Sequence, residues 1–168
     1  GFYFFEKDFT QEELERNYNF YEPITVHESS LSPCVHSILA AKLGKEDKSY
    51  EFYNRAARLD LDDYNNDTED GCHITSMAGT WMSIVKGFGG MMVENGSLHF
   101  SPFLPKQWTE YSFKINFREN QIQVRVIETG VEIENLSTTS CSVHVYGNAY
   151  TLNPSSKELI QIPEETEA

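Results

Sequence analysis

The chain has 168 residues, 39% of them hydrophobic, and a formal net charge of −13, which suits one domain or two small ones with a buried core. The acidic excess argues against nucleic acid and anionic membranes as partners, because phosphate backbones are bound by clustered Lys and Arg. There is no apolar run near the ~18 residues of a membrane span, no signal peptide, and no disulfide or metal pattern among the Cys residues, so a cytoplasmic protein is expected.

The first half of the chain has the residue spacing of helices. Thr10 opens a Thr-Gln-Glu-Glu capping box, which predicts a helix start. Ser32 and Pro33 predict the start of a second helix, with Ser32 as the N-cap and Pro33 in the first turn. Gly44 predicts the end of that helix, and a third helix is expected over about residues 46–59.

A fourth helix has the strongest pattern, because its apolar residues fall on one continuous stripe. The stripe consists of Ile74, Met77, Ala78, Trp81, Met82, Val85 and Phe88. The opposite face carries small, weakly polar residues, namely Ser76, Gly79, Thr80 and Ser83. This combination predicts a helix buried among other helices, with Met77, Trp81 and Met82 in the core and not in a sugar-binding platform.

In the second half of the chain, apolar residues alternate with polar ones, which is the period of strands. The Asn95–Gly96 pair predicts a tight hairpin turn, and further turns are expected at Glu119–Asn120 and Thr129–Gly130. The alternation predicts an antiparallel sheet folded as a sandwich. We therefore divide the chain into a helical part, residues 1–92, and a sheet domain, residues 93–168.

Two polar segments, residues 25–33 and 65–81, lead into helix starts and are rich in hydroxyl groups and His. Helix N-termini present unpaired N–H groups and a partial positive charge, so they attract anions. Hydroxyl groups and a His ring can donate further hydrogen bonds to an anion. The segments predict a phosphate site formed by His73, Ser29, Ser30, Thr75 and Ser76. The alternative is that these groups are ordinary caps and core hydrogen bonds.

An acidic run adjoins the second segment and consists of Asp60, Asp62, Asp63, Asp67, Glu69 and Asp70. It lacks the Gly and Glu positions of a calcium-binding EF-hand loop, so we predict no metal and carboxylates that face solvent or cap helices. These acids would repel phosphate if they shared its site, so some must point elsewhere or bind sugar hydroxyl groups. His27 and Glu28 could form an acid–base pair, with Glu28 as one carboxyl group of a glycosidase.

The segments His27–Pro33 and Asp60–Trp81, together with Phe100–Pro105 and Trp108, resemble glycoside hydrolase family 65 over nearly the whole chain. The resemblance implies an α plus β fold in two parts: the last helices of an (α/α)6 barrel, followed by a small antiparallel C-terminal β-sandwich. The chain lacks an initiator Met and partner helices that would enclose its fourth helix. We therefore expect a C-terminal fragment of a longer polypeptide.

The resemblance also implies glycosyl transfer by an inverting disaccharide phosphorylase, in which inorganic phosphate attacks an α-glucoside and gives β-glucose 1-phosphate. Glu28 and Leu61–Asn66 resemble the branch that acts on maltose, so glucose is the expected second product. Phosphate is expected near His73 and the hydroxyl groups named above. The family's general acid, a Glu of an earlier barrel helix, has no match here, so we expect no catalytic residue in this chain and no cofactor besides the phosphate co-substrate.

The expected partners are the disaccharide, phosphate and the remainder of the same polypeptide, and a homodimer is an open alternative for the complete enzyme. We expect the chain alone to be inactive. One alternative is a family hydrolase that uses water, with Glu28 as the nearby base. Another is a non-catalytic carbohydrate-binding module formed by residues 93–168, although that segment offers few aromatic platforms.

Overall fold

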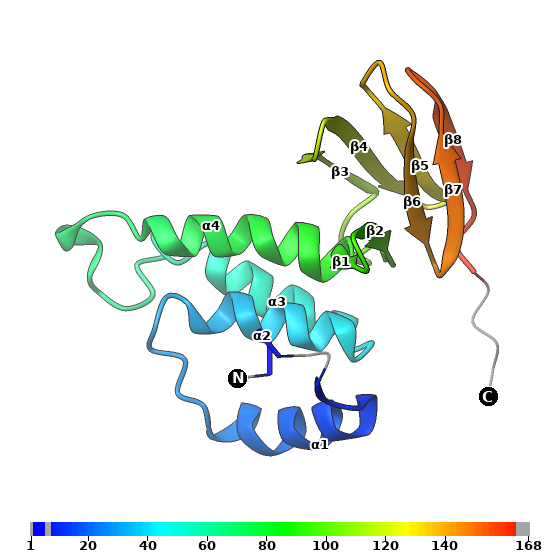
Figure 1. Cartoon of the computed structure of the whole chain (residues 1–168). Coiled ribbons are helices and arrows are strands. Elements are labelled where there is room, and N and C mark those ends of the chain that lie inside the picture. Colours follow the sequence, from blue (N-terminus) through cyan, green and yellow to red (C-terminus); the bar gives the residue numbers. More distant parts are fainter. Residues whose placement is uncertain (1, 6–7, 164–168) are drawn as a thin grey trace. The chain divides into compact units, whose positions relative to one another are not determined.

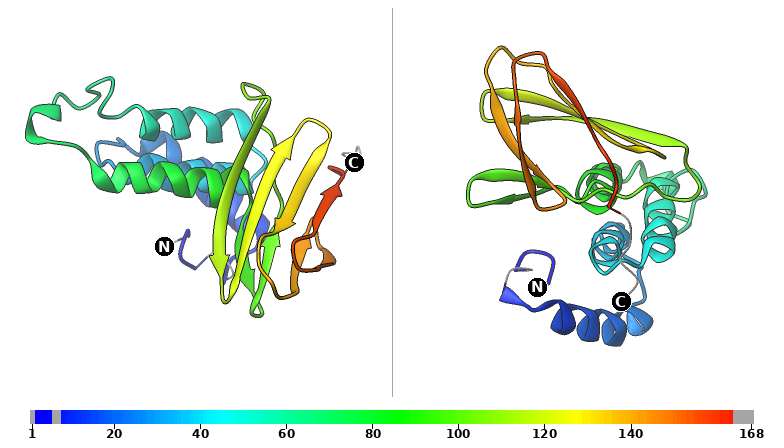
Figure 2. Two further views of the ribbon diagram at one scale, coloured as in Figure 1. Left: turned by 90° about the horizontal axis from the view of Figure 1, so that it is seen from above. Right: turned by 90° about the vertical axis from the view of Figure 1, so that its right-hand side faces the viewer.

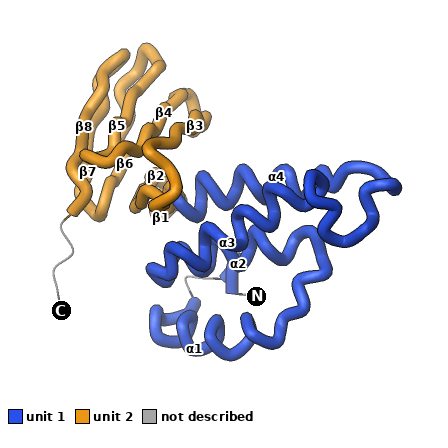
Figure 3. Tube along the Cα trace, turned by 180° about the vertical axis from the view of Figure 1, so that it is seen from behind, with its two compact units in different colours: residues 1–88 blue, residues 89–168 orange. Residues whose placement is uncertain are grey.

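The computed structural model describes residues 2–5 and 8–163. The chain divides into two compact units, residues 1–88 and 89–168, which Figure 3 shows in two colours. The first unit is helical and the second consists of strands (Figure 1), so the predicted change of period is confirmed. The sequence placed the boundary a little later, after residue 92. Within the described residues, no helix has both the length and the apolar character needed to cross a membrane.

The helical unit contains α1 (Gln11–Tyr21), α2 (Ser32–Lys42), α3 (Glu46–Ala57) and α4 (Ile74–Met82), which continues into a π-helix, Ser83–Phe88. Short 3-10 helices lie at Glu22–Ile24 and Thr68–Asp70. The predicted capping box is confirmed, because Thr10 N donates to a Glu13 carboxylate oxygen at 2.9 Å and Glu13 N donates to Thr10 Oγ1 at 3.2 Å. Gly44, with a φ of 68°, follows the end of α2 as predicted.

The start of α2 differs from the prediction. Leu31 is the N-cap, and Ser32 is already the first helical residue. Pro33 lies in the first turn as expected. The Ser32 hydroxyl group does not cap the helix, because it forms a 2.8 Å hydrogen bond with Nδ1 of His27. A contact with the preceding loop thus replaces the local cap that the sequence suggested.

Small residues let α2, α3 and α4 approach one another closely. Ser37 Oγ of α2 donates to Ser49 O of α3 at 2.8 Å, and Ser49 Oγ donates back to Ser37 O at 2.8 Å. Ser76 Oγ of α4 donates to Ala56 O of α3 at 3.0 Å. All three hydroxyl groups are buried and hydrogen-bonded, as buried polar groups in close-packed helices must be. The starts of α2 and α4 and the end of α3 consequently lie at one end of the unit (Figure 1).

The apolar stripe of α4 is only partly buried. Ile74, Met77 and Trp81 are 69%, 51% and 50% exposed within the described chain, so their burial in a core that includes further helices stays a prediction. The small face packs inward instead, through Ser76, Gly79 and Ser83. The stripe turns inward only in the π-helix, where the wider turn shifts the helix face and buries Val85 and Phe88 completely.

Within its described residues, the second unit consists of two four-stranded sheets, which Figure 2 shows as two layers. One sheet has the order β1 (Met92–Glu94), β2 (Ser97–Phe100), β6 (Cys141–Val145), β7 (Asn148–Leu152). The other has the order β3 (Glu110–Phe117), β4 (Asn120–Ile127), β5 (Gly130–Asn135), β8 (Lys157–Ile160). The alternating positions fill the core as predicted, among them Phe113, Ile122, Val124, Val126, Val131, Ile133, Val143 and Val145.

Two details of the sandwich differ from the prediction. Strands β2 and β6 pair in parallel, because the chain leaves β2 to build the other sheet and returns only after β5. The two later turns lie one residue earlier than expected, since Asn120 and Gly130 already pair within β4 and β5. The first turn is confirmed, with φ angles of 48° at Asn95 and 75° at Gly96, as a tight hairpin requires.

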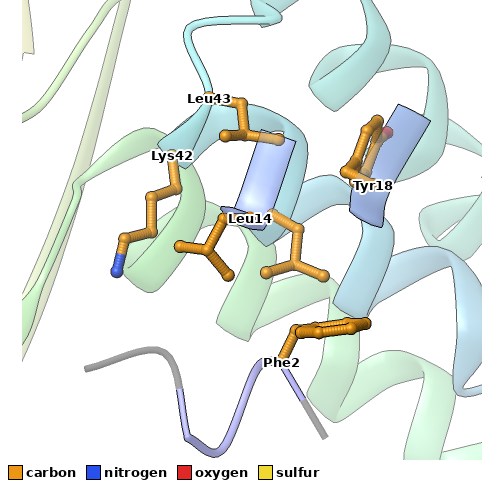
Figure 4. A pocket seen from close by; sticks show the side chains of 6 residues that line it. Phe2, Leu14, Tyr18, Lys42 and Leu43 are labelled. Carbon is orange, nitrogen blue, oxygen red and sulfur yellow. The ribbon is translucent and has the colours of Figure 1, made fainter. Parts of the chain in front are cut away.

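An apolar pocket lies between α1 and α2 (Figure 4). Its lining consists of Phe2, Leu14, Tyr18, Leu39, Lys42 and Leu43. It adjoins a hydrophobic cluster of Tyr18, Leu39 and Ala40. The pocket reaches the C-terminal end of α2, whereas the predicted phosphate site belongs to the N-terminal ends of α2 and α4. It therefore belongs to the packing of α1 and carries none of the predicted site residues.

We expect Gly79→Ala to destabilise the protein. An added Cβ at Gly79 would lie 2.7 Å from Cys34 Sγ and 2.8 Å from Cys34 Cβ. Overpacking of this kind costs about 1–3 kcal/mol, which exceeds the ~1 kcal/mol that Ala gains over Gly in helix propensity. The midpoint of urea unfolding should fall, and Cys34→Ala in the same chain should restore part of the loss. Gly87→Ala is the matched control, because the nearest atom there is at 3.7 Å. Equal midpoints for both variants would contradict the close contact.

Candidate functional site

Two loops meet at the end of the helical unit where α2 and α4 begin. The first loop, residues 25–31, leads into α2, and the second loop, residues 58–73, connects α3 to α4. Arg55 Nη2 of α3 donates to the carbonyl oxygen of His27 at 3.0 Å. Asn65 Nδ2 of the second loop donates to the carbonyl oxygen of Glu28 at 3.3 Å. The bond from Asn65 joins the two segments that the sequence predicted to share a site, and the bond from Arg55 ties the first of them to α3.

His73 stands at the start of α4, between two carboxylates. Its main-chain N–H donates to Asp60 Oδ2 at 2.9 Å, and its ring Nδ1 lies 2.6 Å from Asp60 Oδ1. Its other ring nitrogen, Nε2, lies 3.3 Å from Asp67 Oδ2. The hydrogen bond to Asp60, with the charge of Asp67, raises the pKa of His73, and the same bond lowers the pKa of Asp60. The protonated, positively charged form of the ring is therefore favoured.

The second loop holds its acidic residues in specific contacts. Asp63 has a positive φ of 49°, and its Oδ1 accepts the main-chain N–H groups of Asp67 at 3.1 Å and Thr68 at 3.2 Å. Asp62 pairs with Arg58 through both carboxylate oxygens. Asp62 and Asp63 are nevertheless exposed, so the prediction that these carboxylates face solvent is confirmed for both. Asp60 and Asp67 face His73, so the acids point partly toward the predicted site and neutralise its cation.

His27 is turned inward. It has a positive φ of 57°, and its ring centroid lies 4.5 Å from that of His36 and 4.8 Å from that of Phe52. Burial, followed by the charges of His36 and Arg55, lowers the pKa of His27. Its ring bonds Ser32, while Glu28 is exposed. The possible acid–base pair of His27 and Glu28 stays a hypothesis, with the two side chains in different surroundings.

The predicted hydroxyl ligands fall into two groups. Ser29 and Thr75 are exposed and Ser30 is half-buried, at the starts of the two helices. Ser29 Oγ accepts the N–H of Leu31 at 3.4 Å, which leaves its own hydrogen for another acceptor. Ser76, in contrast, is 1% exposed and donates to Ala56 O. Its hydroxyl group joins two helices and does not belong to the candidate phosphate site.

Sequence reasoning missed Arg55, which joins the first loop to α3. Its guanidinium carbon lies 5.4 Å from the centroid of Tyr64, and its Nε is buried with no hydrogen-bond partner among the described residues. The roles of Asp60 and Asp67 were also missed. In the sequence, Arg55 lies within a predicted helix, and Asp60 and Asp67 lie within the acidic run. No local pattern indicates their contacts, which become visible only in the folded loops.

The described residues contain no group of His, Cys, Asp and Glu arranged to hold a metal ion.

Both parts of the chain match one family of carbohydrate-active enzymes. Residues 1–82 match the central catalytic domain of glycosyl hydrolase family 65, and residues 91–152 match the C-terminal domain of the same family. The chain belongs to glycoside hydrolase family 65. The sequence-based assignment, made from the segments around His27 and His73, is thereby confirmed.

Similar proteins within the family are phosphorylases. The chain is 57% identical over 146 residues to a maltose phosphorylase of Bacillus subtilis (strain 168). This alignment covers 87% of this chain and 19% of that protein. It is also 50% identical over 123 residues to an α,α-trehalose phosphorylase of Thermoanaerobacter brockii. That alignment covers 73% of this chain and 16% of the trehalose phosphorylase. One similar solved structure is a putative kojibiose phosphorylase from the human microbiome. It superposes on this chain with a TM-score of 0.91 and is 43% identical to it in sequence. The superposition covers 99% of this chain and 24% of the solved chain. The chain spans about a fifth of the curated relatives it matches.

We expect His73 and His27 of this family 65 chain to titrate on opposite sides of the ordinary His pKa of about 6.5. Asp60 raises the pKa of His73, and burial lowers that of His27. The stabilising contribution of His73 should be complete below about pH 6.5 and be lost as pH rises through its raised pKa. That of His27 should be complete above about pH 6.5 and be lost as pH falls through its lowered pKa. NMR titration of the ring protons measures both values, and a common pKa for the two rings would contradict the site geometry.

Proposed function

We propose that this chain forms the phosphate-binding side of the active site in an inverting disaccharide phosphorylase. Such an enzyme breaks an α-glucosidic bond with inorganic phosphate and releases β-glucose 1-phosphate and a free sugar. The observation that carries the proposal is the His73 ring, held by Asp60 at the start of α4 beside the first loop. Family membership and the named phosphorylases among the relatives support the reaction class.

The proposed phosphate ligands are the ring of His73 and the hydroxyl groups of Ser29, Ser30 and Thr75. A charged ring donates stronger hydrogen bonds than a neutral group, and the raised pKa of His73 favours that charge. The N–H groups of Ile74, Ser76 and Met77 already donate to carbonyl oxygens, so the first turn of α4 contributes chiefly the positive end of the helix dipole. Hydroxyl groups from the first loop approach from the start of α2. Together these donors suit an anion with several acceptor oxygens.

Phosphate takes the place that activated water has in an inverting hydrolase, so the reaction needs one carboxylic acid to protonate the leaving sugar. Glu28 is exposed at the first loop, which is not the enclosed environment of a catalytic acid. We therefore assign the general acid to another part of a longer polypeptide, within an (α/α)6 barrel whose last helices are α1 to α4. No cofactor enters this scheme.

Maltose is the proposed disaccharide. Identity with the Bacillus subtilis maltose phosphorylase is 57% over 87% of the chain, against 34% over 90% for a kojibiose phosphorylase of Halothermothrix orenii. Glu28 and the Leu61–Asn66 stretch, which carry the resemblance to the maltose branch, lie in the two loops of the candidate site. The products would then be β-glucose 1-phosphate and glucose.

We expect the 168-residue chain alone not to consume maltose in the presence of phosphate, because the proton donor lies elsewhere. The longer polypeptide that carries it should form β-glucose 1-phosphate, which NMR distinguishes from the α-anomer. Turnover by the chain alone would contradict the assignment of the acid. Phosphate-independent release of glucose by the longer polypeptide would instead indicate a hydrolase.

In that longer enzyme, His73→Gln should raise the KM for phosphate by at least about tenfold, which corresponds to the loss of one charge-assisted hydrogen bond. The KM for maltose should change much less, because His73 is proposed to touch only phosphate. His99→Gln, in strand β2 of the other unit, is a control that makes the same substitution at a residue outside the two loops. An unchanged KM for phosphate in His73→Gln would remove the ring from the site.

A further inference from the structure

The two ring nitrogens of His73 face carboxylates that are held in different ways. Asp60 is anchored twice, through Oδ1 at 2.6 Å from Nδ1 and through Oδ2 at 2.9 Å from the main-chain nitrogen. Asp67 makes a single, longer contact of 3.3 Å with Nε2. The Asp67 side chain is also more exposed, at 36% against 18% for Asp60. Nε2 is therefore the nitrogen whose partner can be exchanged.

We propose, on the basis of the phosphate site above, that Asp60 positions the His73 ring while Asp67 competes with phosphate for Nε2. The single N–H at Nε2 cannot donate well to two anions at once. Phosphate that binds this nitrogen must displace the Asp67 carboxylate. Asp67 is thus an internal competitor that weakens phosphate binding, and Asp60 is a positioning residue.

The second loop permits this exchange without refolding. The main chain at Asp67 is fixed, because its N–H and that of Thr68 both donate to Asp63 Oδ1 at 3.1 and 3.2 Å. The Asp67 side chain can still leave Nε2 by changing rotamer. Phosphate carries more acceptor oxygens than a carboxylate, so it can add hydrogen bonds from Ser29 and Thr75 to the one that it takes over.

The competition also explains how the ring can be charged and oriented before phosphate arrives. Both carboxylates raise the pKa of His73, with the hydrogen bond to Asp60 as the largest cause. Asp60 retains the ring orientation when Nε2 changes partner, since it holds both Nδ1 and the main chain. The exchange therefore replaces one anion by another at a ring that does not move.

The decisive experiment measures binding of inorganic phosphate to the 168-residue chain by NMR, through the phosphorus resonance in every variant and also through the ring resonances of His73 where that residue is present. We expect Asp67→Asn to tighten phosphate binding by about two- to fivefold, the range that corresponds to removal of an exposed ion pair. Asp62→Asn is the matched control, because it removes the same charge from the same loop but from a carboxylate paired with Arg58. Its dissociation constant for phosphate should stay close to that of the unchanged chain.

Asp60→Asn should have the opposite effect. Phosphate binding should weaken by about tenfold, because the ring loses a charge-assisted hydrogen bond that orients it. The pKa of His73 should fall at the same time, and the Nδ1 resonance should lose the signature of a short hydrogen bond. A residue with a purely structural role would change the unfolding midpoint without moving these ring signals in the folded protein, and that result would overturn the positioning role.

His73→Gln separates this inference from the proposed function. Loss of phosphate binding in His73→Gln, with unchanged or weaker binding in Asp67→Asn, overturns the competition and leaves the phosphate site standing. An equal gain in Asp62→Asn and Asp67→Asn also overturns the competition, because overall charge then accounts for it. No binding by the unchanged chain, or equal binding by His73→Gln, overturns both proposals.

Discussion

The pairing of Asp60 with His73 is the interaction on which the polar end of the helical unit depends. Asp60 follows the end of α3 and His73 precedes the start of α4, so one carboxylate joins the two helix ends across an irregular loop. Ordering a loop costs conformational entropy, and a charged hydrogen bond to both the ring and the main chain offsets part of that cost. The same contact orients the ring, so the fold and the proposed chemistry share one anchor.

That anchor can act only because the helices beneath it are closely packed. Reciprocal hydroxyl bonds between Ser37 and Ser49, with the missing side chain at Gly79, bring α2, α3 and α4 together. Close approach by small residues leaves the larger apolar residues of α4, such as Met77 and Trp81, on the outer side. The apolar stripe is therefore exposed along α4 and buried within the unit along the π-helix. The change occurs where the α-helix passes into the π-helix.

Local patterns were sufficient where the deciding contacts are local. The capping box at Thr10 and the strand alternation followed from neighbours a few residues apart, and both are confirmed. Ser32 failed as a cap because its hydroxyl group bonds the ring of His27, and Ser76 failed as a ligand because it joins α4 to α3. The meeting of the two loops was foreseen from their position before helix starts. The pairing of His73 with Asp60 was not foreseen, because the two residues lie thirteen positions apart across the loop between α3 and α4.

The chain has a net charge of −13, which by itself would repel phosphate. The proposed phosphate site therefore requires that the negative charges near it are neutralised locally. In the second loop, Arg58 neutralises Asp62, main-chain N–H groups satisfy Asp63, and His73 faces both Asp60 and Asp67. Each of these four carboxylates is therefore paired with a donor, and its field falls off faster than that of a free charge. An approaching anion meets the least firmly held member of this set. Asp67 has only one long contact to the His73 ring, so its displacement requires the least rearrangement. In the proposed site, the carboxylate of Asp67 therefore sets how tightly phosphate binds.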